Sequence, residues 1–288
     1  MSYNIAEKDI VEEITKALNK LGIMFRIFSR IKDNSSLEKK IKSDNKYIDG
    51  SSKIQDLLGI RIVLYFPDDI QLSHKIISNL YEENSKDSSI DELKSNIFKP
   101  IRYNIIYKMP KGSHTISHKH ANLIDLTFEV QIRTVLSEGW HEVEHDLRYK
   151  FKDDWINYSE EDRKLNGVYA SLETSEWTML QIFQSISYKH YKAKNWEAMF
   201  RHHFRMKISN FELDSKLKDI FDSDIELAKK LFKLDRSNLI EEMYKKEYSH
   251  PLTLNNIIYF SNIIFIKNEK ITEITPKTFL NEFSGDDL

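Results

Sequence analysis

The 288-residue chain contains no cysteine. Disulfides, thiolate metal sites and cysteine nucleophiles are therefore excluded, and we expect a protein of a reducing compartment, the cytoplasm. Glycine and proline are also scarce, at seven and five residues. Neither GxGxxG nor GxxxxGKS/T can be assembled from these glycines, so a phosphate site must use side chains, with lysine and arginine as the candidates.

Long apolar runs are missing as well. No window approaches about 18 uninterrupted apolar residues, and the first residues, MSYNIAEKDIVEE, are acidic and amphipathic, so we expect neither a membrane span nor a signal peptide. The net charge is −2, from 43 basic and 45 acidic residues, which gives no overall attraction to nucleic acid. The 40% hydrophobic content suffices for one large domain or two small ones.

Apolar spacing predicts a mixed α/β part followed by a mainly helical part. Residues 9–21 carry apolar side chains at intervals of three and four, as on one face of a helix. Residues 59–66, 101–109 and 123–134 are predicted as strands, and a helix is predicted from 67 to 81.

In the third predicted strand apolar and polar residues alternate. The apolar set is Leu126, Phe128, Val130 and Ile132. Glu129, Gln131 and Arg133 therefore share the opposite face.

The rest of the chain is predicted to be mostly helical. Beyond Thr134 helical spacing places Leu136, Trp140, Val143 and Leu147 on the stripe that faces the core. The segment LTLNNIIYFSNIIFIK is apolar enough for either a helix or a strand. We expect two domains, residues 1–152 and 153–288.

A basic cluster suits a polyphosphate. Arg30, Lys32, Lys39 and Lys40 flank two serines, Ser35 and Ser36, at the start of an element. Hydroxyls and first-turn amides donate to anionic oxygens, while lysine and arginine neutralise them. The alternative is a solvated, lysine-rich surface.

Two carboxylates form a second cluster. Asp56 precedes one predicted strand and Glu129 lies within another, so neighbouring strands would each present an acid. Magnesium bound with a nucleotide takes one or two such carboxylates, and a carboxylate also accepts a hydroxyl proton. Alternatively, Asp56 caps a turn and Glu129 pairs with Arg61 or Arg133.

The predicted helix 139–150 contains His141 and His145 four residues apart, in an HExxH match. Such a pair is found in zinc proteases, but no third ligand follows. The histidine-rich segment 113–120 is expected to be a solvated loop.

Four motifs, in this order, resemble the synthetase domain of the RelA/SpoT alarmone enzymes, most closely the small single-function members and their toxic relatives. They match at Arg30, Lys32, Ser36 and Lys40 (RxKxxxSxxxK), at 56–61 (DLxGIR), at 129–134 (ExQIRT) and at 140–150 (W-x3-EH-x-L-x-YK). The resemblance covers residues 10–152. It implies an α+β, nucleotidyltransferase-like fold with a mixed β-sheet flanked by helices.

The resemblance implies a pyrophosphokinase of the GTP diphosphokinase type, which transfers the β,γ-diphosphate of ATP to the 3′-hydroxyl of GTP, GDP or a related nucleotide. The implied ATP-binding residues are Arg30, Lys32, Ser36, Lys40 and Arg61. Asp56 and Glu129 are implied as the catalytic residues and as ligands of Mg²⁺, with Glu129 as the base. The implied acceptor side consists of Gln131, Arg133, Tyr103 and His145.

One family motif, GYxSxH, is missing, and its tyrosine stacks on the guanine of the acceptor. With the strands aligned on Pro110, its tyrosine position falls on Pro100 and its histidine position on Asn104, which leaves a displaced Tyr103 as the candidate. Residues 99–124 hold five basic residues and no acid. That patch suits the 3′ end of tRNA, so a toxin that pyrophosphorylates tRNA is one alternative. A catalytically silent, nucleotide-sensing module is another.

No hydrolase domain is recognised in the sequence, so we expect an enzyme that only synthesises product. An unopposed synthetase would slow growth. We therefore expect regulation by an antitoxin or another partner, with the helical C-terminal region as the place of control. The alternatives for this region are a plain packing extension and an interface of a homo-oligomer.

Overall fold

The structure is a computed structural model that describes residues 3–43, 47, 52–91, 102–112 and 121–284. These residues form two compact units. The first takes the described residues up to Ala17 and those from Phe25 to Glu176, and the second takes residues 18–24 and those from Trp177 onward. These units differ from the two domains expected from the sequence. The expected domain boundary at residues 152 and 153 stays a prediction.

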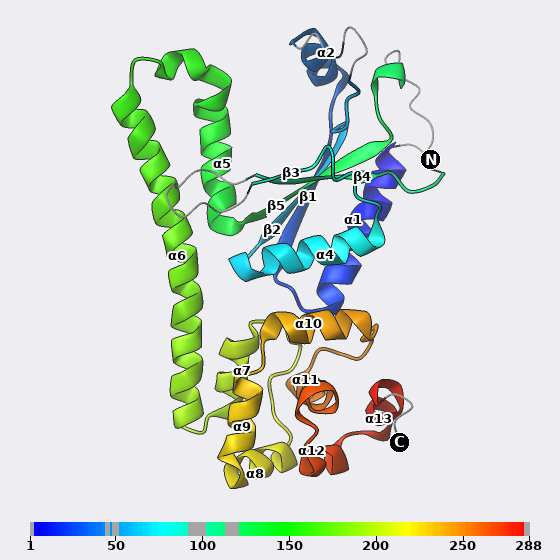
Figure 1. Ribbon diagram of the computed structural model, residues 1–288, viewed down its shortest axis with the longest axis vertical. Coiled ribbons are helices and arrows are strands. Elements are labelled where there is room, and N and C mark those ends of the chain that lie inside the picture. The colour runs from blue at the N-terminus through cyan, green and yellow to red at the C-terminus, as the bar shows by residue number, and fades with distance from the viewer. Residues whose placement is uncertain (1–2, 44–46, 48–51, 92–101, 113–120, 285–288) are drawn as a thin grey trace. The chain divides into compact units, whose positions relative to one another are not determined.

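The first unit contains a mixed sheet flanked by helices, as predicted (Figure 1). Its elements are α1 (Tyr3–Lys20), β1 (Phe25–Ile31), α2 (Asn34–Ser43), β2 (Leu58–Leu64), α4 (Ile70–Leu80), β3 (Ser89–Ile90), β4 (Tyr103–Lys108), β5 (Thr127–Thr134), α5 (Val135–Leu147) and the start of α6 (Ser159–Lys192). In the described residues the strand order is β1-β2-β5-β4-β3. The β2–β5 pair is parallel and the others are antiparallel. Strand β1 was not predicted.

One face of the sheet is covered by α4. Ile60, Phe128 and Val130 are buried on this face. The ring of Tyr81, at the end of α4, packs edge-on against Phe128 with 5.1 Å between centroids, and its hydroxyl donates a hydrogen bond to Glu13 of α1. This apolar layer forms the core of the first unit.

Three expected core positions are wrong. Leu126 precedes β5 and is 44% exposed, and Val143 and Leu147 are more than half exposed. Trp140, on the same expected stripe, is buried as predicted, and its Nε1 donates to the Leu165 carbonyl at 3.0 Å. A polar contact therefore orients this helix, which apolar spacing does not reveal.

The second unit is mainly helical in its described residues, which confirms the predicted helical region. After the end of α6 it contains α7 (Trp196–Phe204), α8 (Ser215–Ser223), α9 (Ile225–Phe232), α10 (Arg236–Lys245), α11 (Leu254–Ser261), a π-helical turn (Asn262–Ile266), α12 (Glu269–Ile274) and α13 (Lys277–Phe283). The ambiguous apolar segment is thus helical. No helix in the described ranges is long and apolar enough to cross a membrane.

We predict that Phe128→Ala lowers the free energy of unfolding of the first unit by about 3–5 kcal/mol, because it empties a fully buried ring site. Urea unfolding followed by circular dichroism measures this. The milder Phe128→Leu gives a smaller loss, and Leu126→Ala serves as the exposed control. Equal losses for Phe128→Ala and Leu126→Ala would contradict the assignment of the covered face.

Candidate functional site

The face of the sheet opposite α4 is lined with polar side chains. The strand register aligns Arg30, Gly59 and Glu129 in one row and Phe28, Arg61, Gln131 and Asn104 in the next. The strands that follow Asp56 and contain Glu129 are neighbours, as predicted, and the alternating burial of β5 sets Glu129, Gln131 and Arg133 on one side. We call this side the open face.

Two amides hold the carboxylate of Glu129. Asn104 Nδ2 donates to Oε1 at 3.0 Å, and Gln131 Nε2 donates to Oε2 at 2.9 Å. Asn104 was not predicted as a site residue, although it occupies the histidine position of the missing motif. Both oxygens of Glu129 are thus oriented by neutral donors, and the predicted alternative pairing with Arg61 or Arg133 is not found among the described contacts.

Asp56 binds two lysines of the basic cluster. Lys32 Nζ lies 2.5 Å from Asp56 Oδ2, and Lys40 Nζ lies 2.7 Å from the same atom. Burial would raise the pKa of Asp56, but the two ammonium groups outweigh it and lower that pKa. Burial lowers the pKa of Lys32, while Asp56 and Glu129 oppose that shift. The negative charges of both predicted carboxylates therefore stabilise the ammonium group of Lys32.

Ser36 lies in the first turn of α2. Its backbone amide and hydroxyl donate to the two carboxylate oxygens of Asp33, at 2.8 and 3.1 Å. The bond from the Ser36 amide, followed by those from the Ser35 and Ser36 hydroxyls, lowers the pKa of Asp33 to about 2. Asp33 thereby caps the helix that carries Lys40. Arg30, on the exposed edge strand β1, lies outside this capping contact.

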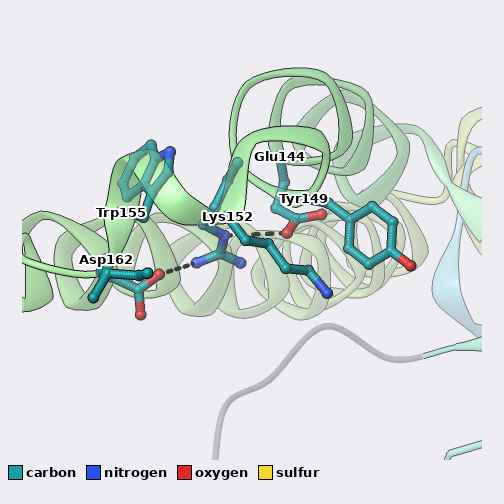
Figure 2. Close-up of a pocket in the computed structure, with 7 residues that line it drawn as sticks. Glu144, Tyr149, Lys152, Trp155 and Asp162 are labelled. Atoms are coloured by element: carbon teal, nitrogen blue, oxygen red, sulfur yellow. Dashed lines mark hydrogen bonds and ion pairs between the residues drawn. The ribbon is translucent and has the colours of Figure 1, made fainter.

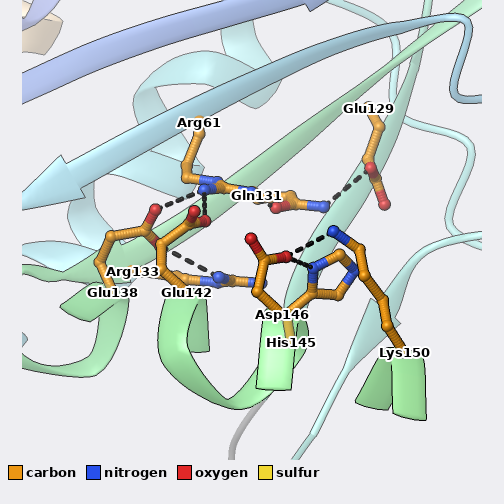
Figure 3. Close-up of polar contacts among 9 residues, drawn as sticks. All are labelled: Arg61, Glu129, Gln131, Arg133, Glu138, Glu142, His145, Asp146 and Lys150. Carbon is orange, nitrogen blue, oxygen red and sulfur yellow. Dashed lines mark hydrogen bonds and ion pairs between the residues drawn. The ribbon is translucent and has the colours of Figure 1, made fainter. Parts of the chain in front are cut away.

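Arg61 and Arg133 are bound by carboxylates of α5 (Figure 3). Arg61 Nη1 lies 2.5 Å from Glu138 Oε1 and also contacts Glu142, and its Nε donates to Gln131 Oε1 at 3.3 Å. Arg133 Nη1 lies 3.0 Å from the other Glu138 oxygen. Burial would lower the pKa of Arg61, but the two glutamates raise it. Sequence reasoning missed both glutamates, which the four-residue spacing after ExQIRT could have indicated.

Two predicted acceptor residues have partners other than Glu129. Tyr103 points to the α4 face, where its hydroxyl lies 2.9 Å from Nδ1 of His74. His145 is exposed on α5, 3.0 Å from Asp146, with its ring stacked on Tyr149. Within the described residues the structure brings neither side chain into contact with Glu129. The histidine-rich segment 113–120 lies outside the described residues.

The two histidines of the HExxH segment differ in their surroundings: His141 is buried, whereas His145 is exposed. Burial, together with the charges of Arg133 and Arg61, lowers the pKa of His141 to about 3, so its ring is neutral. Across the described ranges no three His, Asp or Glu side chains are grouped to hold a metal ion. A magnesium ion held by Asp56 and Glu129 would need further ligand oxygens. In nucleotide complexes of magnesium, phosphate oxygens and water supply them.

A pocket of about 260 Å³ lies outside the open face, between the end of α5, the turn at Tyr149–Trp155 and α6 (Figure 2). It is lined by Glu144, Arg148, Tyr149, Lys152, Trp155, Ile156 and Asp162. Arg148 is paired with Glu144 and Asp162, and the Lys152 ammonium lies 4.2 Å from the Tyr149 ring centroid. These cations already have partners, and none of the predicted site residues lines the pocket.

Comparison with known proteins gives matches in the part of the chain that holds the open face. Residues 29–154 match the family model described as the region found in RelA / SpoT proteins. GTP pyrophosphokinase YjbM of Bacillus subtilis (strain 168) is 26% identical over 127 residues, which are 43% of this chain. The match spans 56% of that relative, little more than half its length.

Solved structures give weaker likenesses. Small alarmone synthetase 1 from Bacillus subtilis has a TM-score of 0.44 and 21% identity, covering 62% of this chain and 93% of that one. A GTP pyrophosphokinase family protein from Streptococcus pneumoniae has the same score and identity, with 62% and 88% covered. The matched residues, 29–154, contain all four sequence motifs, so this part of the chain is similar to the region found in RelA / SpoT proteins.

Proposed function

We propose that this chain is an ATP-dependent pyrophosphotransferase that modifies the 3′-hydroxyl of a guanine or related nucleotide. The observation that carries the proposal is the position of Glu129. Its carboxylate is held by two amides on the open face, which also carries Arg61. Its charge interacts with that of Lys32, which shares Asp56 with Lys40. A proton acceptor beside a set of cations is what transfer of a diphosphate requires.

In the proposed reaction the 3′-oxygen of the acceptor attacks the β-phosphorus of ATP. A new bond forms between these atoms, and the bond from the β-phosphorus to the oxygen that bridges it to the α-phosphorus breaks, so that AMP leaves. Glu129 accepts the proton of the hydroxyl. Asn104 and Gln131 fix the direction of that carboxylate, which lowers the cost of alignment.

The donor phosphates are proposed to lie against the basic cluster. Lys32 and Lys40 neutralise the β- and γ-phosphates, with Arg30, Ser36 and Arg61 as further contacts. The two lysines are held by Asp56. Polyphosphate oxygens would replace that carboxylate as their partner, which frees Asp56 for a metal ion.

Asp56 and Glu129 are the residues proposed to hold magnesium. Asp56 forms an ion pair with Lys32, and the negative charge of Glu129 also interacts with that lysine. Carboxylate oxygens are suitable ligands for this ion, and bound magnesium would supply positive charge that neutralises the phosphates during transfer.

The acceptor is proposed to bind on the open face. Gln131 and Arg133 lie on the open face, whereas Tyr103 does not. In the predicted tRNA-binding patch, Arg102 and Lys108 are paired with acids, so the described residues do not favour tRNA over a mononucleotide. We retain modification of tRNA and a catalytically silent sensor as outcomes of the assay.

The first test is transfer from ATP labelled in the β,γ-diphosphate to GTP, GDP, ATP or deacylated tRNA. We expect label on GTP or GDP, loss of transfer with EDTA, and recovery with Mg²⁺. Label on tRNA alone would replace the acceptor in this proposal. Absence of transfer to every acceptor, while ATP still binds, would leave only the sensor.

A second test addresses Glu129. Glu129→Gln should lower the turnover number by about 100-fold or more, because the amide cannot take the proton, while ATP binding measured by calorimetry is retained. Glu82→Gln, an exposed acid paired with Lys108, is the charge-matched control. Near-normal turnover of Glu129→Gln would reject its role as base.

A third test uses Gly59, which lies between Arg30 and Glu129 and contributes no side chain to the open face. A Cβ atom there would meet only the Arg30 carbonyl oxygen, at 3.9 Å, so Gly59→Val should fold normally. Its branched side chain should nevertheless weaken binding of a non-hydrolysable ATP analogue by about tenfold or more, with Gly59→Ala intermediate. Unchanged affinity with a normal urea midpoint would show that the ligand lies elsewhere.

A further inference from the structure

Two carboxylates on consecutive turns of α5 meet one guanidinium. Glu138 and Glu142 are four residues apart and so lie on the same helical face. Both contact Nη1 of Arg61, the residue proposed to bind the donor phosphates. An anionic ligand that uses Arg61 must therefore share the guanidinium with these glutamates or displace one of them.

The two glutamates differ in burial and in partners. The Glu138 side chain is 13% exposed, and its second oxygen is bound by Arg133. It also lies in the first turn of α5, where a helix stabilises negative charge. Glu138 is therefore fixed by three favourable interactions, and its loss would leave two guanidinium groups poorly neutralised.

Glu142 is bound much less firmly. Its side chain is 57% exposed, and Arg61 is its only hydrogen-bond partner in the described part of the chain. Exposed ion pairs contribute little to stability because water solvates both charges well. Withdrawal of Glu142 would leave Arg61 paired with Glu138, so the exchange costs less at this position than at Glu138.

Arg61 also connects this pair to the rest of the open face. Its Nε donates to Gln131, which in turn donates to Glu129 (Figure 3). The chain Glu142–Arg61–Gln131–Glu129 is thus continuous. A change of partner at one end of it would alter the position of the guanidinium that contacts Gln131.

We infer that Glu142 is the exchangeable partner of Arg61 and sets the affinity of the donor site. It neutralises Arg61 while the site is free of ligand, and a phosphate oxygen of the donor takes its place on binding. Glu138 stays bound to both arginines throughout. The inference rests on the proposed function, because it assigns the displacing anion to the ATP phosphates.

The test is calorimetric titration of the full chain with a non-hydrolysable ATP analogue in the presence of Mg²⁺. Glu142→Gln should lower the dissociation constant by about two- to fivefold, as expected from the loss of one exposed ion pair that competes with the ligand. The gain should shrink at high salt. Glu160→Gln, which removes another exposed acid, paired with Lys164, should leave the dissociation constant unchanged.

A double-variant cycle separates displacement from a general effect of charge. In an Arg61→Gln background, Glu142→Gln should have no further effect on the dissociation constant. A persisting gain in that background, or an unchanged or raised dissociation constant for Glu142→Gln alone, would overturn the inference.

Inorganic tripolyphosphate distinguishes the inference from the proposed function. If the wild-type chain does not bind the ATP analogue, the proposed function fails, and titration with tripolyphosphate then decides the role of Glu142. Tighter binding of tripolyphosphate by Glu142→Gln supports exchange at Arg61. Equal binding, or no binding by either chain, rejects it.

Discussion

The parallel pairing of β2 with β5 is the constraint on which the site depends. Its register sets Gly59 opposite Glu129 and Arg61 opposite Gln131, residues 70 positions apart in the second pair. Because side chains alternate along a strand, a slip of one residue would turn these polar groups into the core. Burial of Phe128 on the other face makes such a slip costly. The apolar face therefore determines the geometry of the polar one.

A second constraint is charge compensation. Each pair of cations on the open face shares one carboxylate, Asp56 for Lys32 and Lys40 and Glu138 for the two arginines. Partial burial disfavours isolated charges, and the shared acids offset that cost. Under the proposed function, a polyanion would exchange partners with these carboxylates rather than meet free cations. A chain with net charge −2 can in this way hold two pairs of cations close together.

Periodicity predicted the sheet's central strands, the first helix and the common face of Glu129 and Gln131. It missed β1, because this edge strand is largely exposed and holds two arginines, so it shows no continuous apolar run. It also misjudged Val143, because α5 is oriented by polar contacts. Tyr103 was assigned to the acceptor side from its proximity to the missing motif, but alternation along β4 turns it toward α4.

The sequence by itself determined which chemistry is available: no thiols, no glycine-rich phosphate loop, and four spaced motifs that supply basic groups and two carboxylates. Only the tertiary structure decided the partners. It set Asn104 beside Glu129 and joined both arginines to Glu138. Helix and strand periodicity follows from backbone geometry within a few residues. These contacts, in contrast, form between segments that meet only when the strands pair into the sheet. Their strength depends on burial, which no local pattern encodes.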